Sequence, residues 1–170
     1  MSASAFERLK VMVVEDNHHM RSLLRVMLNS IGIRDILEAG NGGAALQMMR
    51  ENNCDLVLCD LSMQPVDGLQ FCLAVRNADK SPNPFLPIVM ITGHTEKNRV
   101  EAARDAGVTE FLAKPITAAS LLSRLAEILE RPRPFVRAEG YFGPDRRRKA
   151  QENYTGPWRR QGDLADMQVQ

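Results

Sequence analysis

The sequence predicts an α/β fold: a doubly wound parallel sheet with helices on both faces, followed by an irregular C-terminal tail. Apolar runs of strand length alternate with segments of helical periodicity up to about residue 130. The runs are almost continuously apolar, which is typical of strands buried on both faces. The connections are short, and each crossover between parallel strands must be right-handed, which leaves few possible topologies.

Five strands and five helices are expected in alternation. The expected strands are residues 10–14, 35–39, 56–60, 87–92 and 110–113. Helical repeats cover residues 20–31, 43–51, 69–77 and 96–106, and a last one follows residue 117. Gly32 and Gly107 directly follow two of these repeats and are expected to end them. Thr117 is expected to cap the last helix.

The composition is that of an ordinary globular protein. The chain has 170 residues, of which 44% are hydrophobic and 25% charged, so a core of normal size is available. Residues 1–130 carry 13 basic and 16 acidic side chains, whereas residues 131–170 carry 9 and 5. We therefore expect an acidic domain over 1–130 and a basic tail, rich in proline and arginine, over 131–170.

The three cysteines predict neither a zinc site nor a disulfide framework, because their number is odd and their spacing does not fit metal ligands. The first residues hold no apolar stretch long enough for a signal peptide, and no run has the length of a membrane span. A cytoplasmic protein without membrane insertion is therefore expected.

Four of the expected strands end in polar residues that suit phosphoryl chemistry: Glu15-Asp16, Asp60, Thr92 and Lys114. The carboxyl ends of parallel strands meet at one edge of a sheet. Asp60 could accept a phosphoryl group covalently, while Asp16 and Asp60 bind Mg²⁺ and Glu15 acts through water. Lys114 and Thr92 would hold the phosphoryl oxygens. The alternative is a set of ordinary polar residues at strand ends.

The order and spacing of these residues, with Asp67-Gly68 and Lys114-Pro115, resemble the receiver domains of bacterial two-component response regulators over residues 8–130. The resemblance implies a flavodoxin-like strand order, 2-1-3-4-5. It implies that Asp60 takes a phosphoryl group from a sensor histidine kinase or phosphotransfer protein and thereby switches protein–protein interactions. Such a domain catalyses only its own phosphorylation and dephosphorylation, so an enzyme with a separate substrate is not expected.

The resemblance also assigns individual residues. It implies a cis peptide bond before Pro115. Family members often have Met-Pro after the phosphoacceptor, whereas this chain has Met63-Gln64-Pro65, so a loop of different shape is expected there. The implied Mg²⁺ ligands are Glu15, Asp16, Asp60 and the backbone carbonyl of Ser62.

A switch is expected at Thr92 and Phe111. Movement of Thr92 toward a phosphoryl group would vacate space near Phe111, and in receivers an aromatic side chain at this position swings inward. The alternative is a static core phenylalanine. The helix 96–106 has a weak apolar stripe, and such helices shift easily. His94 and Arg99 near its start are candidates for partner binding, or else part of an ordinary solvated face.

The tail contains a repeated motif, Tyr-x-Gly-Pro-x-Arg-Arg, at residues 141–147 and again at 154–160. Its Gly-Pro pair is expected to form a turn that places the aromatic residue beside the arginines. The alternative is a disordered, solubilising extension. Candidates for partner binding through this motif are Tyr141, Arg146, Arg147, Tyr154, Trp158, Arg159 and Arg160.

Two other functional classes fit part of the sequence. The basic tail could bind nucleic acid, but no helix-turn-helix unit fits after residue 130, so a downstream protein target is preferred. A phosphatase of the haloacid dehalogenase type also uses an aspartate nucleophile with Thr, Lys and Mg²⁺. It needs a second aspartate two residues further on, where this chain has Ser62.

Overall fold

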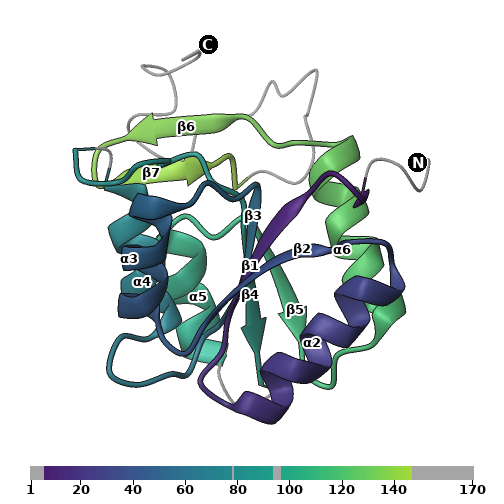
Figure 1. The fold of residues 1–170 in the computed structure, drawn as a ribbon. Helices are drawn as coiled ribbons and strands as arrows, with labels where there is room; N and C mark the ends of the chain where they lie inside the picture. Colours follow the sequence, from purple (N-terminus) through teal and green to yellow (C-terminus); the bar gives the residue numbers. More distant parts are fainter. Residues whose placement is uncertain (1–5, 78, 94–96, 147–170) are drawn as a thin grey trace.

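The computed structural model describes residues 6–77, 79–93 and 97–146 of the chain. At its centre lies a sheet of order β2-β1-β3-β4-β5 in which every neighbouring pair is parallel (Figure 1). The predicted five-stranded sheet and its strand order are confirmed. The strands are β1 (Lys10–Val14), β2 (Asp35–Ala39), β3 (Leu56–Asp60), β4 (Ile88–Thr92) and β5 (Glu110–Ala113).

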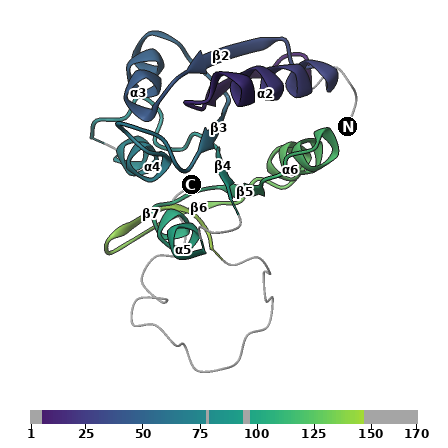
Figure 2. The same ribbon diagram turned by 90° about the horizontal axis from the view of Figure 1, so that it is seen from below.

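Helices cover both faces of this sheet. They are α2 (His18–Ser30), α3 (Gly42–Glu51), α4 (Gly68–Arg76), α5 (Lys97–Asp105) and α6 (Ala118–Glu130). Figure 2 shows α2 and α6 on one side of the strands and α3, α4 and α5 on the other. In the part of the chain that the structure describes, no helix is long and apolar enough to cross a membrane.

The strands supply both hydrophobic layers. Val11 and Val13 of β1 pack with the core residues of α2 and α6, while Met12 and Val14 pack with those of α3 and α4. Successive side chains of a strand point to opposite faces of the sheet. The continuously apolar runs of the sequence therefore reflect burial on both sides.

Short polar residues begin most of the helices, and glycines end two of them. Gly32 after α2 and Gly107 after α5 have positive φ angles of 101° and 95°, as the sequence predicts for helix ends. The N-terminal caps of α2, α3, α4 and α6 are Asn17, Asn41, Asp67 and Thr117. The side chain of each cap accepts a hydrogen bond from a backbone N–H of the first helical turn, and the predicted cap on α6 is thereby confirmed.

A β-hairpin follows α6 and lies at the end of the sheet where β4 and β5 begin (Figure 1). Its strands β6 (Phe135–Ala138) and β7 (Tyr141–Pro144) pair antiparallel, and Gly140 in the turn has a φ of 72°. The prediction of an irregular tail is therefore wrong for residues 135–144. An isolated hairpin of this size is barely stable in water, so its formation depends on packing against the domain.

Aromatic and glycine contacts hold the hairpin to the domain. The rings of Phe135 and Phe142 each lie 5.2 Å from the ring of Phe85, in the loop before β4. Gly143 packs so closely on Gly107 that a Cβ at position 143 would lie 2.7 Å from the Cα of Gly107. Any larger side chain at either glycine would therefore push the hairpin away.

Two ion pairs fix the open end of the hairpin. Arg133 Nη2 lies 3.0 Å from Glu110 Oε1 at the start of β5, and Arg146 Nη1 lies 2.6 Å from Asp105 Oδ1 at the end of α5. The hairpin thus joins the domain on the side formed by α5 and β5.

The three cysteines are free thiols, of which Cys59 and Cys72 are buried. Burial raises the pKa of Cys54 and of Cys72 to about 11, which keeps both thiols protonated near neutral pH. This agrees with a packing role for the cysteines rather than a reactive one.

Candidate functional site

The structure brings the predicted acidic residues together at the carboxyl edge of the sheet. Carboxylate oxygens of Glu15, Asp16 and Asp60 lie within 4.8 Å of one another. Lys114 Nζ is 2.7 Å from Asp60 Oδ1 and 3.8 Å from Glu15 Oε2. Only 2% of Glu15 and 4% of Asp60 is exposed, so these charges interact largely outside bulk water.

Strand register explains this arrangement. Val14, the last residue of β1, pairs with Cys59, so Glu15 and Asp60 leave neighbouring strands at the same level. Thr92 at the end of β4 pairs with Ala113 of β5, and the Lys114 backbone N–H donates to the Thr92 carbonyl at 2.8 Å. Four strand ends therefore deliver their polar residues to one edge, as the sequence predicts.

The acidic cluster has the properties of a cation site. Burial raises the pKa of Glu15 most strongly, and the neighbouring Asp60 and Asp16 raise it further, against the lowering effects of the Asn17 backbone N–H and Lys114. Glu15 Oε2 is buried and, among the described residues, has no hydrogen-bond partner. A buried oxygen of this kind is suited to a divalent cation or to water bound by one.

The loop after β3 orients the Asp60 carboxylate. The Ser62 backbone N–H donates to Asp60 Oδ2 at 3.1 Å, while Lys114 holds the other oxygen. The two carboxylate oxygens therefore have different partners and a fixed orientation. The metal-binding role of the Ser62 carbonyl stays a prediction.

Two prolines near the site follow cis peptide bonds. The bond between Lys114 and Pro115 is cis, which confirms the prediction from the resemblance. The bond between Gln64 and Pro65 is also cis, which is not predicted from the sequence. The displaced proline in this loop was the only sign in the sequence of an unusual backbone there.

The expected switch residues lie in the predicted strands. Thr92 is buried at the end of β4. Phe111 of β5 is partly buried, pairs in register with Met90, and packs against the core layer beneath α3, α4 and α5. Its inward movement on phosphorylation stays a prediction.

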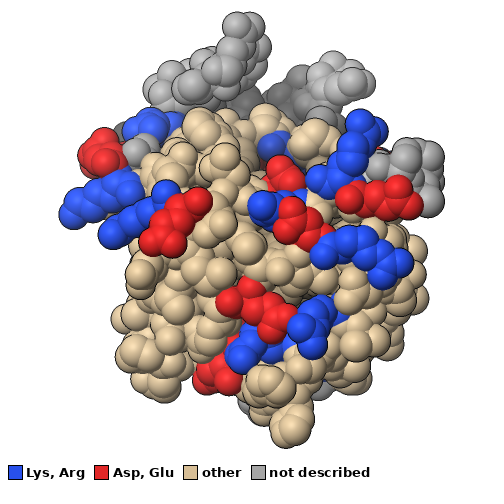
Figure 3. All heavy atoms as spheres, viewed as in Figure 1, with Lys and Arg blue, Asp and Glu red and all other residues tan. Residues whose placement is uncertain are grey.

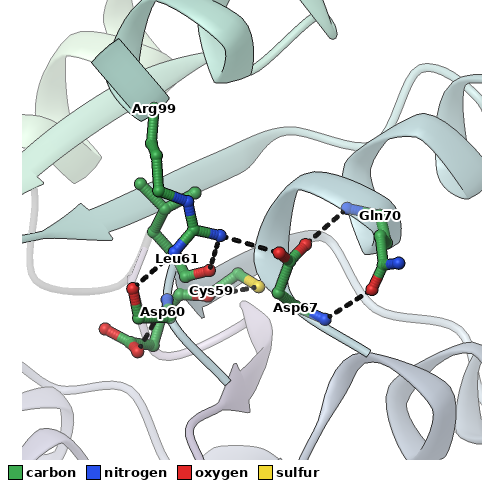
Figure 4. A network of polar contacts seen from close by, with 7 residues as sticks. Cys59, Asp60, Leu61, Asp67, Gln70 and Arg99 are labelled. Carbon is green, nitrogen blue, oxygen red and sulfur yellow. Dashed lines mark hydrogen bonds and ion pairs between the residues drawn. The ribbon is translucent and has the colours of Figure 1, made fainter. Parts of the chain in front are cut away.

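Arg99, a candidate for partner binding, is engaged within its own chain. Its Nη1 donates to Ser62 Oγ at 2.7 Å, and its Nη2 donates to Asp67 Oδ2 at 2.7 Å and to the Leu61 carbonyl at 3.2 Å (Figure 4). At least 32 residues separate Arg99 from each of these partners, so no local pattern in the sequence could predict the contacts.

The first copy of the tail motif lies partly within β7. The Tyr141 hydroxyl donates to the Pro144 carbonyl at 2.7 Å, and Arg146 Cζ lies 4.3 Å from the Tyr141 ring centroid. The predicted proximity of aromatic and arginine is therefore confirmed for this copy. The predicted Gly-Pro turn is wrong, because Gly143 and Pro144 belong to the strand and the turn lies at Gly140.

The remaining candidates for partner binding lie outside the described residues; they are His94, Arg147, Tyr154, Trp158, Arg159 and Arg160. On the face drawn in Figure 3, the described basic and acidic side chains are intermixed and leave wide uncharged areas between them. That face has no continuous basic surface of the kind that favours nucleic acid.

Residues 11–126 match the model of the response regulator receiver domain family. Among curated proteins, chemotaxis protein CheY-3 of Vibrio cholerae is 30% identical over 131 residues, which cover 77% of this chain and 99% of that protein. The chemotaxis protein CheY of Pseudomonas aeruginosa is 30% identical over 123 residues, which cover 72% of this chain and 98% of that protein.

Solved structures give the same result. The receiver domain of NtrX from Brucella abortus has a TM-score of 0.64 at 27% identity, with 72% of this chain and 99% of that one covered. The receiver domain of the sensor histidine kinase PA1611 from Pseudomonas aeruginosa was solved with a magnesium ion coordinated in its active site cleft. It has a TM-score of 0.63 at 26% identity, with 70% and 95% covered. The chain therefore belongs to the response regulator receiver domain family, the phosphoryl-accepting switches of two-component signal transduction.

Proposed function

We propose that Asp60 is the phosphoacceptor and that its donor is a phosphohistidine on a sensor histidine kinase or a phosphotransfer protein. The observation that carries this proposal is the setting of the Asp60 carboxylate, which is buried, lies 2.7 Å from the Lys114 ammonium, and adjoins Glu15 and Asp16. In the transfer, an Asp60 oxygen forms a bond to phosphorus while the bond from phosphorus to the donor's imidazole nitrogen breaks.

A divalent cation, Mg²⁺, completes the site in this proposal. Glu15, Asp16 and Asp60 would hold it with the backbone carbonyl of Ser62, and the buried Glu15 Oε2 supports such a site. When bound, the ion neutralises charge on the transferred phosphoryl oxygens. Lys114 neutralises charge from the side of β5, and the Thr92 hydroxyl donates a hydrogen bond to the phosphoryl group.

The phosphorylated domain would act by changing its contacts with a protein target rather than by turning over a separate substrate. Ser62 stands where a phosphatase of this chemistry needs an acid–base aspartate, which supports a switch. Thr92 and Phe111 would carry the change to the side formed by α5 and β5. Residues 1–130 form the receiver unit in this proposal. Residues 131–170 follow it as a segment that contacts partners, and the hairpin within this segment packs on the receiver unit.

The test is labelling of the full chain by acetyl phosphate in the presence of Mg²⁺. Asp60→Asn removes the attacking carboxylate and is expected to abolish labelling. Asp79→Asn changes an exposed acid in the loop after α4 and is expected to label like the wild type. Undiminished labelling of the Asp60 variant would overturn the assignment.

A further inference from the structure

One arginine ties helix α5 to the loop that follows the candidate phosphoacceptor (Figure 4). Arg99 lies in the first turn of α5, and its guanidinium donates to Ser62 Oγ, the Leu61 carbonyl and Asp67 Oδ2 at 2.7, 3.2 and 2.7 Å. All three acceptors belong to the segment that joins β3 to α4. A planar guanidinium with several donors can bridge such a set, whereas an ammonium on a flexible stem cannot match its geometry.

Only one residue separates this guanidinium from the Asp60 carboxylate. Ser62 donates its backbone N–H to Asp60 Oδ2 at 3.1 Å and accepts from Arg99 through its hydroxyl at 2.7 Å. Ser62 therefore links the Asp60 carboxylate to Arg99, through its backbone N–H on one side and its hydroxyl on the other.

The contact with Asp67 joins two helices. Asp67 Oδ1 accepts from the Gln70 backbone N–H at 2.9 Å and caps α4, and Asp67 Oδ2 accepts from Arg99 at 2.7 Å. One carboxylate thus serves both the start of α4 and the start of α5. A loss of Arg99 from this site would release α5 while leaving the cap of α4 in place.

Helix α5 has few buried side chains, and its ion pair between Asp105 and Arg146 lies at the end away from Arg99. Of its described side chains only Ala103 is buried, Val100 is half-buried, and most of the others are polar. Arg99 and Asp67 are 39% and 26% exposed, so their ion pair is of moderate strength and can be broken by a competing anion. Helices with few apolar contacts are readily displaced.

We propose that Arg99 is a positioning residue that holds the loop after Asp60 and transmits phosphorylation of Asp60 to α5. The acyl phosphate carries nearly two negative charges where the Asp60 carboxylate carried one, and it brings three acceptor oxygens next to Ser62. Arginine binds phosphate in a forked geometry, so this group competes with Asp67 for the guanidinium and loosens the start of α5. The inference rests on phosphorylation of Asp60 and is separate from the expected movement of Thr92 and Phe111.

The test is amide hydrogen exchange in α5 of the full chain, before and after treatment with acetyl phosphate and Mg²⁺, with intact mass giving the phosphorylated fraction. Arg99→Ala and Asp67→Asn are expected to speed exchange at residues 101–103, the first amides of α5 with partners inside the helix, by about two- to fivefold before treatment. Asparagine keeps the cap of α4 but removes the charge that Arg99 contacts. The matched control Arg104→Ala changes an exposed arginine of the same helix and is expected to leave these rates unchanged.

Phosphorylation of the wild type is expected to speed the same amides, and in Arg99→Ala this response is expected to fall to less than half. Arg99→Lys keeps the positive charge but loses the forked donor geometry of the guanidinium. It is therefore expected to show only part of the wild-type exchange response to phosphorylation. Labelled protein whose α5 exchange responds equally in the wild type and Arg99→Ala would overturn the coupling alone. Absence of labelling in the wild type would overturn the proposed function and, with it, the coupling.

Discussion

The two ends of the central sheet both contain buried charged side chains but satisfy them differently. Where the strands finish, Glu15 Oε2 is buried without a hydrogen-bond partner among the described residues. Where β4 and β5 begin, the buried Arg76 donates to the carbonyls of Gly107, Pro84 and Leu86 at 2.8–2.9 Å. A buried charged group that lacks a hydrogen-bond partner is suited to bind a ligand. A buried charged group that hydrogen-bonds to backbone carbonyls stabilises the fold instead.

The hairpin contributes to the surroundings of Arg76 at the end of the sheet where β4 and β5 begin. Burial lowers the pKa of Arg76, and its guanidinium lies 5.0 Å from the ring centroid of Phe135 in β6. Phe135 also belongs to the aromatic cluster that anchors the hairpin on Phe85. The first part of the tail is therefore a structural component of this end of the domain. Changes at the acidic end should affect phosphorylation, and changes at the arginine end should affect stability.

Removal of divalent cations should have the largest effect, and it should act at the acidic end. Treatment with EDTA is expected to lower the rate of labelling by acetyl phosphate at least ~100-fold, because uncompensated charge at Glu15, Asp16 and Asp60 would repel the phosphoryl oxygens. Returning excess Mg²⁺ should restore the rate. An unchanged rate after chelation would contradict the cation site.

Lys114→Ala should have the next largest effect. Loss of the ammonium 2.7 Å from Asp60 Oδ1 is expected to slow labelling by roughly 100-fold, because a positioned positive charge no longer stabilises the transferred group. The control Lys80→Ala changes an exposed residue in the loop after α4 and should label normally. Equal rates for the two variants would mean that Lys114 takes no part in the transfer.

Arg76→Ala should act at the opposite end of the sheet, where it should lower stability without changing the labelling rate. It leaves several buried carbonyls without donors and removes the partner of Phe135, so the free energy of unfolding should fall by about 3 kcal/mol. Urea denaturation measures this loss, and Arg50→Ala, at an exposed position in α3, is the matched control. The labelling rate per folded molecule should stay within about twofold of the wild type, since the contacts of Arg76 with the described residues lie away from the acidic edge. A marked loss of labelling at full folding would show that the two ends are coupled.

Gly143→Ala should have the smallest effect, confined to the hairpin. Its methyl group would lie 2.7 Å from Gly107 Cα, so residues 135–144 are expected to separate from the domain at a cost of about 1–2 kcal/mol. Amide exchange should rise in the hairpin and not at the acidic edge. Ala138→Ser, at an exposed position of β6, should leave exchange unchanged. Equal protection of the hairpin in both variants would argue against the glycine contact as its anchor.

The acidic end was predictable from the sequence because topology alone determines it. Parallel strands finish at one edge, so residues that follow apolar runs, such as Asp60 and Lys114, must meet there. No such rule predicts the contacts of Arg76 at the end of the sheet where β4 and β5 begin. Arg76 reads as an ordinary basic residue in the last turn of a helix, and its acceptors come from two separate loops.

The hairpin and the Arg99 contacts were missed because long-range packing creates them. The close approach of Gly143 to Gly107 joins residues 36 positions apart in the sequence. The motif itself is visible as a repeat, but its Gly-Pro pair predicts a turn, because that pair usually forms one. Here the glycine serves close packing and the turn falls at Gly140, where the backbone has a positive φ.

The anchoring of Arg146 on Asp105 also fixes the hairpin at the end of the domain opposite Asp60. Arg146 is the last residue that the structure describes, and it lies beside the end of α5, away from Asp60. A protein that contacts the hairpin and a kinase that approaches Asp60 would meet different surfaces. Both could be bound at once, with the receiver as a bridge that raises the local concentration of one for the other.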